Sequence, residues 1–88
     1  MYYTYILLLS NRTLYKGSTS DLRRRIEEHK RGGVRSTKNC LPFELIGYEA
    51  YTLKSDAQRR EKFLKTTEGG RLLHQQYRDA LKKIGNKK

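Results

Sequence analysis

The fold is decided by the stretch Tyr2–Thr19, which reads YYTYILLLSNRTLYKGST. Residues 2–9 are rich in aromatic and long aliphatic side chains, and the run Ile6–Leu9 does not alternate, which is typical of a strand covered on both faces. Asn tolerates left-handed geometry, so residues 10–13 are predicted to turn. A second short strand over residues 13–17 then completes an antiparallel hairpin.

The length of the hairpin loop decides which side chains share a face of the sheet. A two-residue loop (residues 11–12) puts Tyr5 and Tyr15 on opposite faces, because side-chain direction alternates along a strand. A three-residue loop, in which Ser10 faces Leu14, puts both tyrosines on the same face. The residues alone leave both registers open.

A helix is predicted over residues 21–30. Hydroxyl side chains at residues 18–20 offer N-caps, and Gly32-Gly33 stop the helix. Residues three and four apart share a helix face, and one stripe holds Leu22, Arg25, Ile26 and His29. Of the three consecutive arginines, only Arg25 lies on the same helix face as the apolar residues.

The rest of the chain is predicted to add one strand and two helices. A loop over residues 32–42 leads to a strand, with Ile46, Tyr48 and Ala50 expected on one face and Leu45 and Glu49 on the other. Ser55 and Gln58 resemble a capping box that opens the next helix. Its inward stripe includes Glu61, an unusual place for a carboxylate. Residues 66–70 are expected to break this helix before a terminal one. The predicted fold is α+β: a three-stranded antiparallel sheet (2–9, 13–17, 43–52) flanked by helices (21–30, 55–66, 70–84).

Composition restricts the partners of this chain. Its 88 residues predict one domain, and its net charge of +11 attracts polyanions. Nucleic acid is favoured over an anionic membrane, since no apolar run approaches the roughly 20 residues of a spanning helix. Cys40 is the single cysteine, which fits a reducing compartment and a cytoplasmic, bacterial or phage-like location. One cysteine and two distant histidines make no structural zinc site.

Three segments resemble the motifs of the GIY-YIG nuclease family: Tyr3-Thr4-Tyr5, Tyr15-Lys16-Gly17, and Asp21-Leu22 followed by Arg25 and His29. Glu61 is similar to the metal-binding glutamate of that family. The resemblance covers residues 2–65 and is nearest to small stand-alone bacterial and phage members. Tyr3 stands where the motif has its first glycine, and Lys16 where it has an aliphatic residue. Many members place an asparagine after the glutamate helix, and here the only later one is Asn86.

The resemblance implies a three-stranded antiparallel sheet flanked by helices, and cleavage of phosphodiester bonds in DNA that depends on Mg²⁺ or Mn²⁺. It implies the following roles: Tyr5 and Tyr15 are the motif tyrosines, Gly17 is the motif glycine, Arg25 is the catalytic arginine, Glu61 is the metal ligand, and His29 is a histidine seen one turn after the arginine. Both tyrosines line one site in the family, so the resemblance favours the loop register that brings them together.

These residue types suit phosphodiester hydrolysis. Mg²⁺ commonly takes one or two carboxylates and keeps several waters, so Glu61 is enough for one ion. The planar guanidinium of Arg25 engages phosphate oxygens with two parallel bonds. A tyrosine, with an ordinary pKa of about 10, needs help from the metal or from Arg25 to take a proton from water. Tyr5, Tyr15 and His29 are all candidate bases, with Tyr5 preferred, or Tyr15 if it lies nearer the water.

Each of these residues taken alone has an ordinary structural explanation, but the ordered set is far more specific. Basic side chains flank the predicted site and would hold backbone phosphates without reading sequence: Lys16, Arg23, Arg24, Lys30, Arg35, Lys38, Arg60 and Lys62. We therefore predict a structure-selective or weakly specific endonuclease acting on branched, nicked or duplex DNA, with no membrane partner. The alternative is a non-catalytic nucleic-acid-binding module that keeps the nuclease fold. The sequence does not indicate an oligomeric state.

Overall fold

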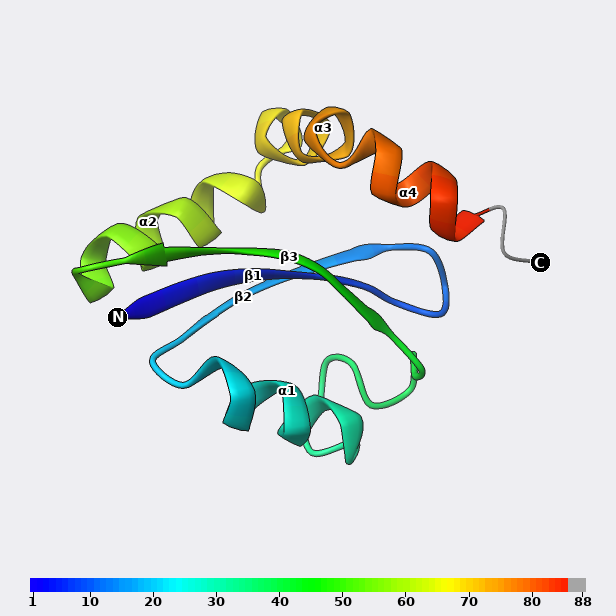
Figure 1. The fold of residues 1–88 in the computed structure, drawn as a ribbon, viewed down its shortest axis with the longest axis horizontal. Coiled ribbons are helices and arrows are strands. Elements are labelled where there is room, and N and C mark those ends of the chain that lie inside the picture. Colours follow the sequence, from blue (N-terminus) through cyan, green and yellow to red (C-terminus); the bar gives the residue numbers. More distant parts are fainter. Residues whose placement is uncertain (86–88) are drawn as a thin grey trace.

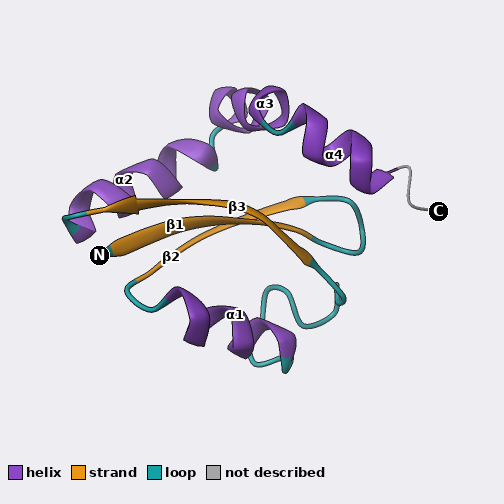
Figure 2. Ribbon diagram, viewed as in Figure 1, coloured by secondary structure: helices purple, strands orange, loops and turns teal. Residues whose placement is uncertain are grey.

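The computed structural model describes residues 1–85 and shows a three-stranded antiparallel sheet with helices on both faces (Figure 1). The elements in chain order are β1 (Tyr2–Leu8), β2 (Leu14–Thr19), α1 (Leu22–Lys30), β3 (Glu44–Tyr51), α2 (Lys54–Leu64), α3 (Thr67–Gln76) and α4 (Arg78–Gly85). The strand order is β2-β1-β3. Helix α1 covers one face, and α2, α3 and α4 lie over the other (Figure 2). The predicted α+β architecture is confirmed.

The hairpin has a three-residue loop, but it begins one residue earlier than predicted. The amide of Leu9 donates to the carbonyl of Thr13 at 2.9 Å, so residues 10–12 form the loop. Arg12, with φ of 71°, holds the left-handed position, while the Asn11 side chain accepts hydrogen bonds from Thr13. In this register Tyr5 pairs with Gly17 and Tyr15 pairs with Leu7, so the side chains of Tyr5 and Tyr15 point to the same face of the sheet.

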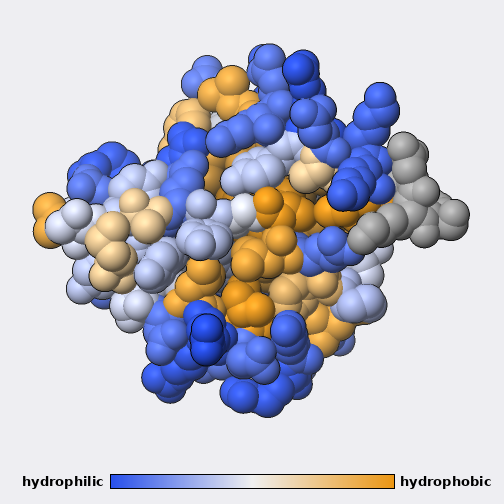
Figure 3. Space-filling view, viewed as in Figure 1, coloured by the Kyte–Doolittle hydropathy of each residue, from blue (hydrophilic) through white to orange (hydrophobic). Residues whose placement is uncertain are grey.

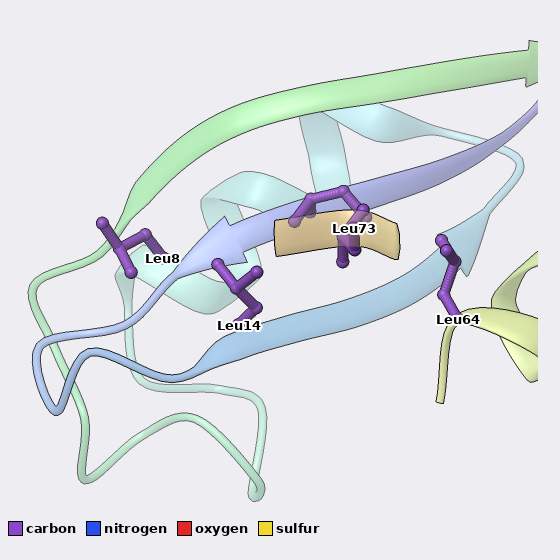
Figure 4. Packing of buried hydrophobic residues seen from close by; sticks show 5 residues of the cluster. Leu8, Leu14, Leu64 and Leu73 are labelled. Atoms are coloured by element: carbon purple, nitrogen blue, oxygen red, sulfur yellow. The ribbon is translucent and has the colours of Figure 1, made fainter. Parts of the chain in front are cut away.

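Strand β1 is buried on both faces, as its unbroken apolar run predicts. On one face, α2 and α3 close a core of Ile6, Leu8, Leu14, Leu64 and Leu73, four of which are labelled in Figure 4. On the other face, α1 covers a second cluster built on Tyr5, Leu7 and Leu9. Apolar residues correspondingly gather in the middle of the space-filling view, with hydrophilic residues above and below them (Figure 3). Burying each large aliphatic side chain contributes about 1.5–3 kcal/mol, so the two clusters hold the helices against the sheet.

A bulge in β3 overturns the predicted face pattern of that strand. Ile6 pairs with Gly47, but Leu7 pairs with Leu45, so Ile46 is the extra residue. Ile46 packs with the core under α2 and α3, whereas Tyr48, opposite Tyr5, lies on the α1 face. The prediction that Ile46 and Tyr48 share a face was therefore wrong, because one inserted residue reverses side-chain direction.

The terminal region also differs from the prediction: two helices, α3 and α4, replace one over residues 70–84, and Gly69-Gly70 lie inside α3. The hydroxyl of Thr66 caps α3 by accepting from the amide of Gly69 at 3.0 Å. A Cβ on Gly69 would overlap the carbonyl of Phe63. Gly69 thus allows α3 to begin directly against the end of α2. Strand β2 continues two residues past Gly17, and α2 runs over Lys54–Leu64 rather than 55–66.

None of the helices within residues 1–85 is long and apolar enough to cross a membrane.

Candidate active site

The two motif tyrosines and His29 form an aromatic cluster between the sheet and α1. Tyr5 comes from β1, Tyr15 from β2, and His29 from the last turn of α1. The ring centroids of Tyr5 and Tyr15 are 6.3 Å apart, and those of Tyr15 and His29 are 5.3 Å apart. Phe43 closes the far side of the His29 ring at 5.9 Å. The structure therefore places three of the predicted site residues in direct contact.

Gly17 makes room for Tyr5. The two residues face each other across β1 and β2, and a Cβ on Gly17 would overlap the Tyr5 phenol ring. The hydroxyl of Tyr5 thereby passes over β2, which is an edge strand of the sheet. The motif glycine is needed for the close approach of this side chain rather than for a turn.

We expect Gly17→Ala to lower the free energy of unfolding by about 1–3 kcal/mol, the usual cost of overpacking a core. Thermal denaturation measures this as a fall in Tm of roughly 4–8 °C per kcal/mol in a domain of this size. Gly70→Ala is the matched control. Its Cβ would meet nothing nearer than 4.0 Å, and alanine favours the helix, so Tm should hold or rise. Equal Tm values for wild type and Gly17→Ala would contradict this role of the glycine.

Tyr5 and His29 are fully buried and joined to Thr37 by hydrogen bonds. The Tyr5 hydroxyl lies 2.8 Å from Nε2 of His29, and Nδ1 of His29 lies 2.7 Å from Oγ1 of Thr37. Burial raises the pKa of Tyr5 to about 12, although Arg25 acts in the opposite direction. Burial, and then the charge of Arg25, lowers the pKa of His29 below its usual 6.5. At neutral pH the hydroxyl is therefore protonated and the imidazole is neutral.

The lowered pKa of His29 makes stability depend on pH. The unfolded chain binds the proton more readily than the folded one, so stability is full above pH 6.5 and falls as the pH drops below it. We expect Tm to decline between roughly pH 7.5 and 5.5 in wild type and much less in His29→Gln. Thermal melts across this range measure the difference in slope. The control His74→Gln, at an exposed position, should keep the wild-type slope, and a His29→Gln slope equal to wild type would contradict the expectation.

Arg25 is the arginine of α1 that reaches the site. Its side chain is 37% exposed, whereas that of Arg24 is 78% exposed. Its guanidinium donates to Glu28 at 3.1 Å, and the nearby Tyr5 hydroxyl raises the pKa of Arg25. A hollow of about 220 Å³ opens beside it, lined by residues 18–21 with Arg24, Arg25 and Glu28. The guanidinium is therefore held by Glu28 and borders an open hollow.

Glu61 approaches β2 from the opposite face of the sheet. The hydroxyl of Ser18 donates to Oε1 at 2.5 Å, and Nζ of Lys65 donates to Oε2 at 2.7 Å. The Glu61 charge reaches Tyr5, whose pKa it raises. Tyr5, Tyr15, Arg25 and Glu61 are thus grouped around β2, with the carboxylate on one face and the other three on the other.

A single divalent cation fits the donor set at Glu61. A carboxylate offers about four lone-pair positions, and Ser18 and Lys65 use two of them. Within residues 1–85, no three His, Cys, Asp or Glu side chains gather to form a metal cage. An ion here would be held by one carboxylate and by water, as Mg²⁺ accepts. The ammonium of Lys65, which donates to Oε2 of Glu61, would have to move away for a cation to bind that oxygen.

Most of the predicted phosphate-binding side chains are exposed: Arg23, Arg24, Lys30, Arg35, Lys38 and Lys62. Arg60 differs, because its guanidinium pairs with Glu49 at 3.0 and 3.3 Å and lies over Phe63. That pair links α2 to β3 and gives Arg60 a structural role. Lys16 is half-buried, and burial followed by the charge of Lys65 lowers its pKa. Asn86 lies outside the described residues.

Ser18, Thr37 and Lys65 contact the site residues, and the sequence did not predict these contacts of Ser18 and Thr37. Lys65 follows Glu61 by four residues on a helix, a spacing that pairs side chains and was a usable signal. Ser18 follows the motif glycine directly, and its partner is 43 residues away. Thr37 lies in an irregular loop without periodicity. Only the folded chain reveals the last two.

Comparison with known proteins identifies the family of this chain. The model of the GIY-YIG catalytic domain matches residues 1–73. A UPF0213 protein of Streptococcus agalactiae is 41% identical over 64 residues, covering 72% of this chain and 73% of that protein. One from Natronomonas pharaonis is 38% identical over 66 residues, covering 74% and 78%. The solution NMR structure of a UPF0213 protein from Bacillus halodurans is 34% identical with a TM-score of 0.53, covering 83% of this chain and 82% of that one. A match over most of the chain, joined to a site with both motif tyrosines, shows that the chain belongs to the GIY-YIG family.

Proposed function

We propose that this protein is a divalent-metal-dependent endonuclease that hydrolyses phosphodiester bonds in DNA, with structural selectivity or weak sequence specificity. The observation that carries the proposal is the grouping of a half-buried arginine, two tyrosines and a carboxylate around β2, with Arg25 lining an open hollow. Hydrolysis of a phosphodiester needs an activated water, stabilisation of charge on the phosphoryl oxygens and help for the leaving oxygen. These residues supply groups for each need.

Arg25 is the proposed phosphate-binding residue. Its guanidinium is held by Glu28 and partly exposed to solvent, so it needs little reorganisation to meet a phosphate. Two parallel N–H donors fit two phosphoryl oxygens and strengthen as negative charge develops. Arg23 and Arg24 on the exposed side of α1 would hold neighbouring phosphates.

Glu61 is the proposed metal ligand, oriented by the hydroxyl of Ser18. A divalent ion bound there supplies a Lewis acid for the phosphoryl oxygens and lowers the pKa of a coordinated water. The side chain of Tyr5 is 0% exposed, so it does not reach solvent water, whereas Tyr15 is half-buried. We therefore propose that Tyr15 orients the attacking water and that Tyr5 supports the guanidinium of Arg25.

The proposal is tested by incubating the protein with branched, nicked and plain duplex DNA in Mg²⁺ or Mn²⁺. We expect incision that stops on addition of a chelator, with branched or nicked substrates cut at least as fast as the plain duplex. Tyr15→Phe should reduce the rate while leaving DNA binding unchanged. Binding of all three DNAs without incision in either metal would overturn the proposal.

A non-catalytic nucleic-acid-binding module is the second candidate. The ammonium of Lys65 already neutralises Glu61, which favours this reading. A binding module would show affinity that falls steeply with salt, through release of counterions, and no dependence on divalent ions. Lys65→Gln separates the two candidates: it should tighten Mn²⁺ binding at Glu61 in a nuclease, and only weaken DNA binding in a module.

A further inference from the structure

The buried hydroxyl of Thr37 contacts the His29 ring, and the proposed reaction gives this contact no role. Thr37 lies in the loop between α1 and β3, is 0% exposed, and holds Nδ1 of His29 at 2.7 Å. The other ring nitrogen, Nε2, lies 2.8 Å from the Tyr5 hydroxyl. An imidazole held at both nitrogens has its tautomer set by its neighbours. The groups at the two ends of this chain therefore decide which nitrogen carries the proton.

The Tyr5 hydroxyl forms one end of the chain, 2.8 Å from Nε2 of His29. Arg25 lies near this hydroxyl, and their proximity is the largest cause of the raised pKa of Arg25. A guanidinium has five donors and no acceptor, so beside Arg25 the Tyr5 proton is best directed at Nε2 of His29. In that arrangement Nε2 carries a lone pair.

Val34 forms the other end. The hydroxyl of Thr37 donates to the carbonyl of Val34 at 3.4 Å. A hydroxyl has one proton, so at its other contact Thr37 accepts, and the donor is Nδ1–H of His29. Both ends thus demand the same neutral tautomer, with the proton on Nδ1 and the lone pair on Nε2.

We propose that Thr37 is a positioning residue of the active site, which sets the tautomer of His29 so that Nε2 accepts the hydrogen bond of the Tyr5 hydroxyl. This inference rests on the proposed function for the role of the site in DNA cleavage. The donors run in one direction, from Tyr5 to His29, Thr37 and Val34. If the tautomer reversed, Nε2 would carry the proton, and the Tyr5 hydroxyl would have to turn its own proton away from His29.

Two substitutions isolate the hydroxyl of Thr37. Thr37→Val removes it and keeps a branched side chain, whereas Thr37→Ser keeps it. Thr4→Val is the matched control, because Thr4 is also 0% exposed and its hydroxyl donates at 2.8 Å to the carbonyl of Ala57, on the other side of β1. Any general effect of losing a buried threonine hydroxyl appears in both valine variants, and the tautomer effect in Thr37→Val alone.

Long-range nitrogen-15 NMR of the imidazole rings above neutral pH reads the tautomer directly. Only His29 and His74 contribute, and His74→Gln assigns them. We expect wild type, Thr37→Ser and Thr4→Val to show the proton of His29 on Nδ1, and Thr37→Val to lose that preference. The Nε–H resonance of Arg25 should shift in Thr37→Val and not in Thr4→Val. A wild-type His29 protonated on Nε2, or an unchanged tautomer in Thr37→Val, would overturn the inference.

Cleavage kinetics add a second readout. Thr37→Val should lower kcat by about 10- to 100-fold, the usual cost of losing a group that orients a site residue, with a smaller change in KM. Thr37→Ser should restore most of kcat. If wild type cuts no DNA, the nuclease proposal fails, and the NMR signals still decide whether Thr37 sets the tautomer. If wild type cuts DNA and Thr37→Val cuts it at the same rate, the inference fails alone.

Discussion

Arg25→Ala should lower the rate of DNA cleavage by about 1,000-fold or more, the range found where a single arginine stabilises the charge of a phosphoryl transition state. The guanidinium is already held by Glu28 beside the hollow, so its loss removes an oriented charge and two parallel donors. The measurement is single-turnover cleavage of a nicked or branched duplex under saturating protein. DNA binding should fall by much less, because the exposed cations remain.

The neighbouring arginine supplies the control for this experiment. Arg24 belongs to the same helix and also pairs with Glu28, at 3.9 Å, but its side chain points into solvent. Arg24→Ala should therefore weaken DNA binding modestly and leave the single-turnover rate near wild type. Arg25→Lys keeps the charge but loses the planar fork, so it should recover only a small part of the activity. Equal losses in Arg24→Ala and Arg25→Ala would show that Arg25 is one cation of a diffuse surface.

The selection of Arg25 shows what helical periodicity predicts well. Among three consecutive arginines, spacing alone placed Arg25 on the seam with Leu22 and Ile26, and in the structure it is the half-buried one. The same kind of reasoning predicted that β1 is covered on both faces, because its apolar residues do not alternate. Side-chain direction repeats with a fixed period along helices and strands, so the sequence predicts which of their residues are buried.

Irregular backbone was predicted less well, for physical reasons that differ from case to case. Asn11 was expected to favour the left-handed position of the hairpin, but its side chain caps Thr13 instead and Arg12 takes that position. The bulge at Ile46 depends on pairing with β1, which no local pattern encodes. Gly69-Gly70 read as a helix break, yet close packing on Phe63 outweighs their low helix propensity.

The residues of the site also divide into those that the sequence predicted and those that it did not. Its motif residues stand at spacings that a family resemblance makes visible, and the side chains of Tyr5, Tyr15 and His29 meet because the hairpin parity and α1 bring them together. The groups that orient them, Ser18 and Thr37, act through hydrogen bonds between different elements. Such contacts have no sequence period, so they emerge only from the folded chain.

Glu61→Gln should abolish activation by divalent ions, with cleavage falling by at least about 100-fold, as for loss of a principal electrostatic group in an active site. The amide keeps the size of the side chain and an oxygen for the Ser18 hydroxyl, but it removes the charge that holds a cation. Titrating cleavage against Mn²⁺ and following Mn²⁺ binding directly by electron paramagnetic resonance measure the two effects separately. Both should be lost together, because the Glu61 charge is the group that holds the proposed ion.

Stability distinguishes this result from a general disruption of α2. The ion pair of Glu61 with Lys65 lies at the surface, with the lysine side chain 55% exposed, and such pairs contribute about 0–1 kcal/mol. The Tm of Glu61→Gln should therefore stay within a few degrees of wild type. Glu68→Gln, an exposed carboxylate in the first turn of α3, should change neither Mn²⁺ binding nor cleavage. If Glu61→Gln cleaves at the wild-type rate with an unchanged Mn²⁺ optimum, the ion is held elsewhere. In that case the hydrogen bond from Ser18 serves only to dock α2 on β2.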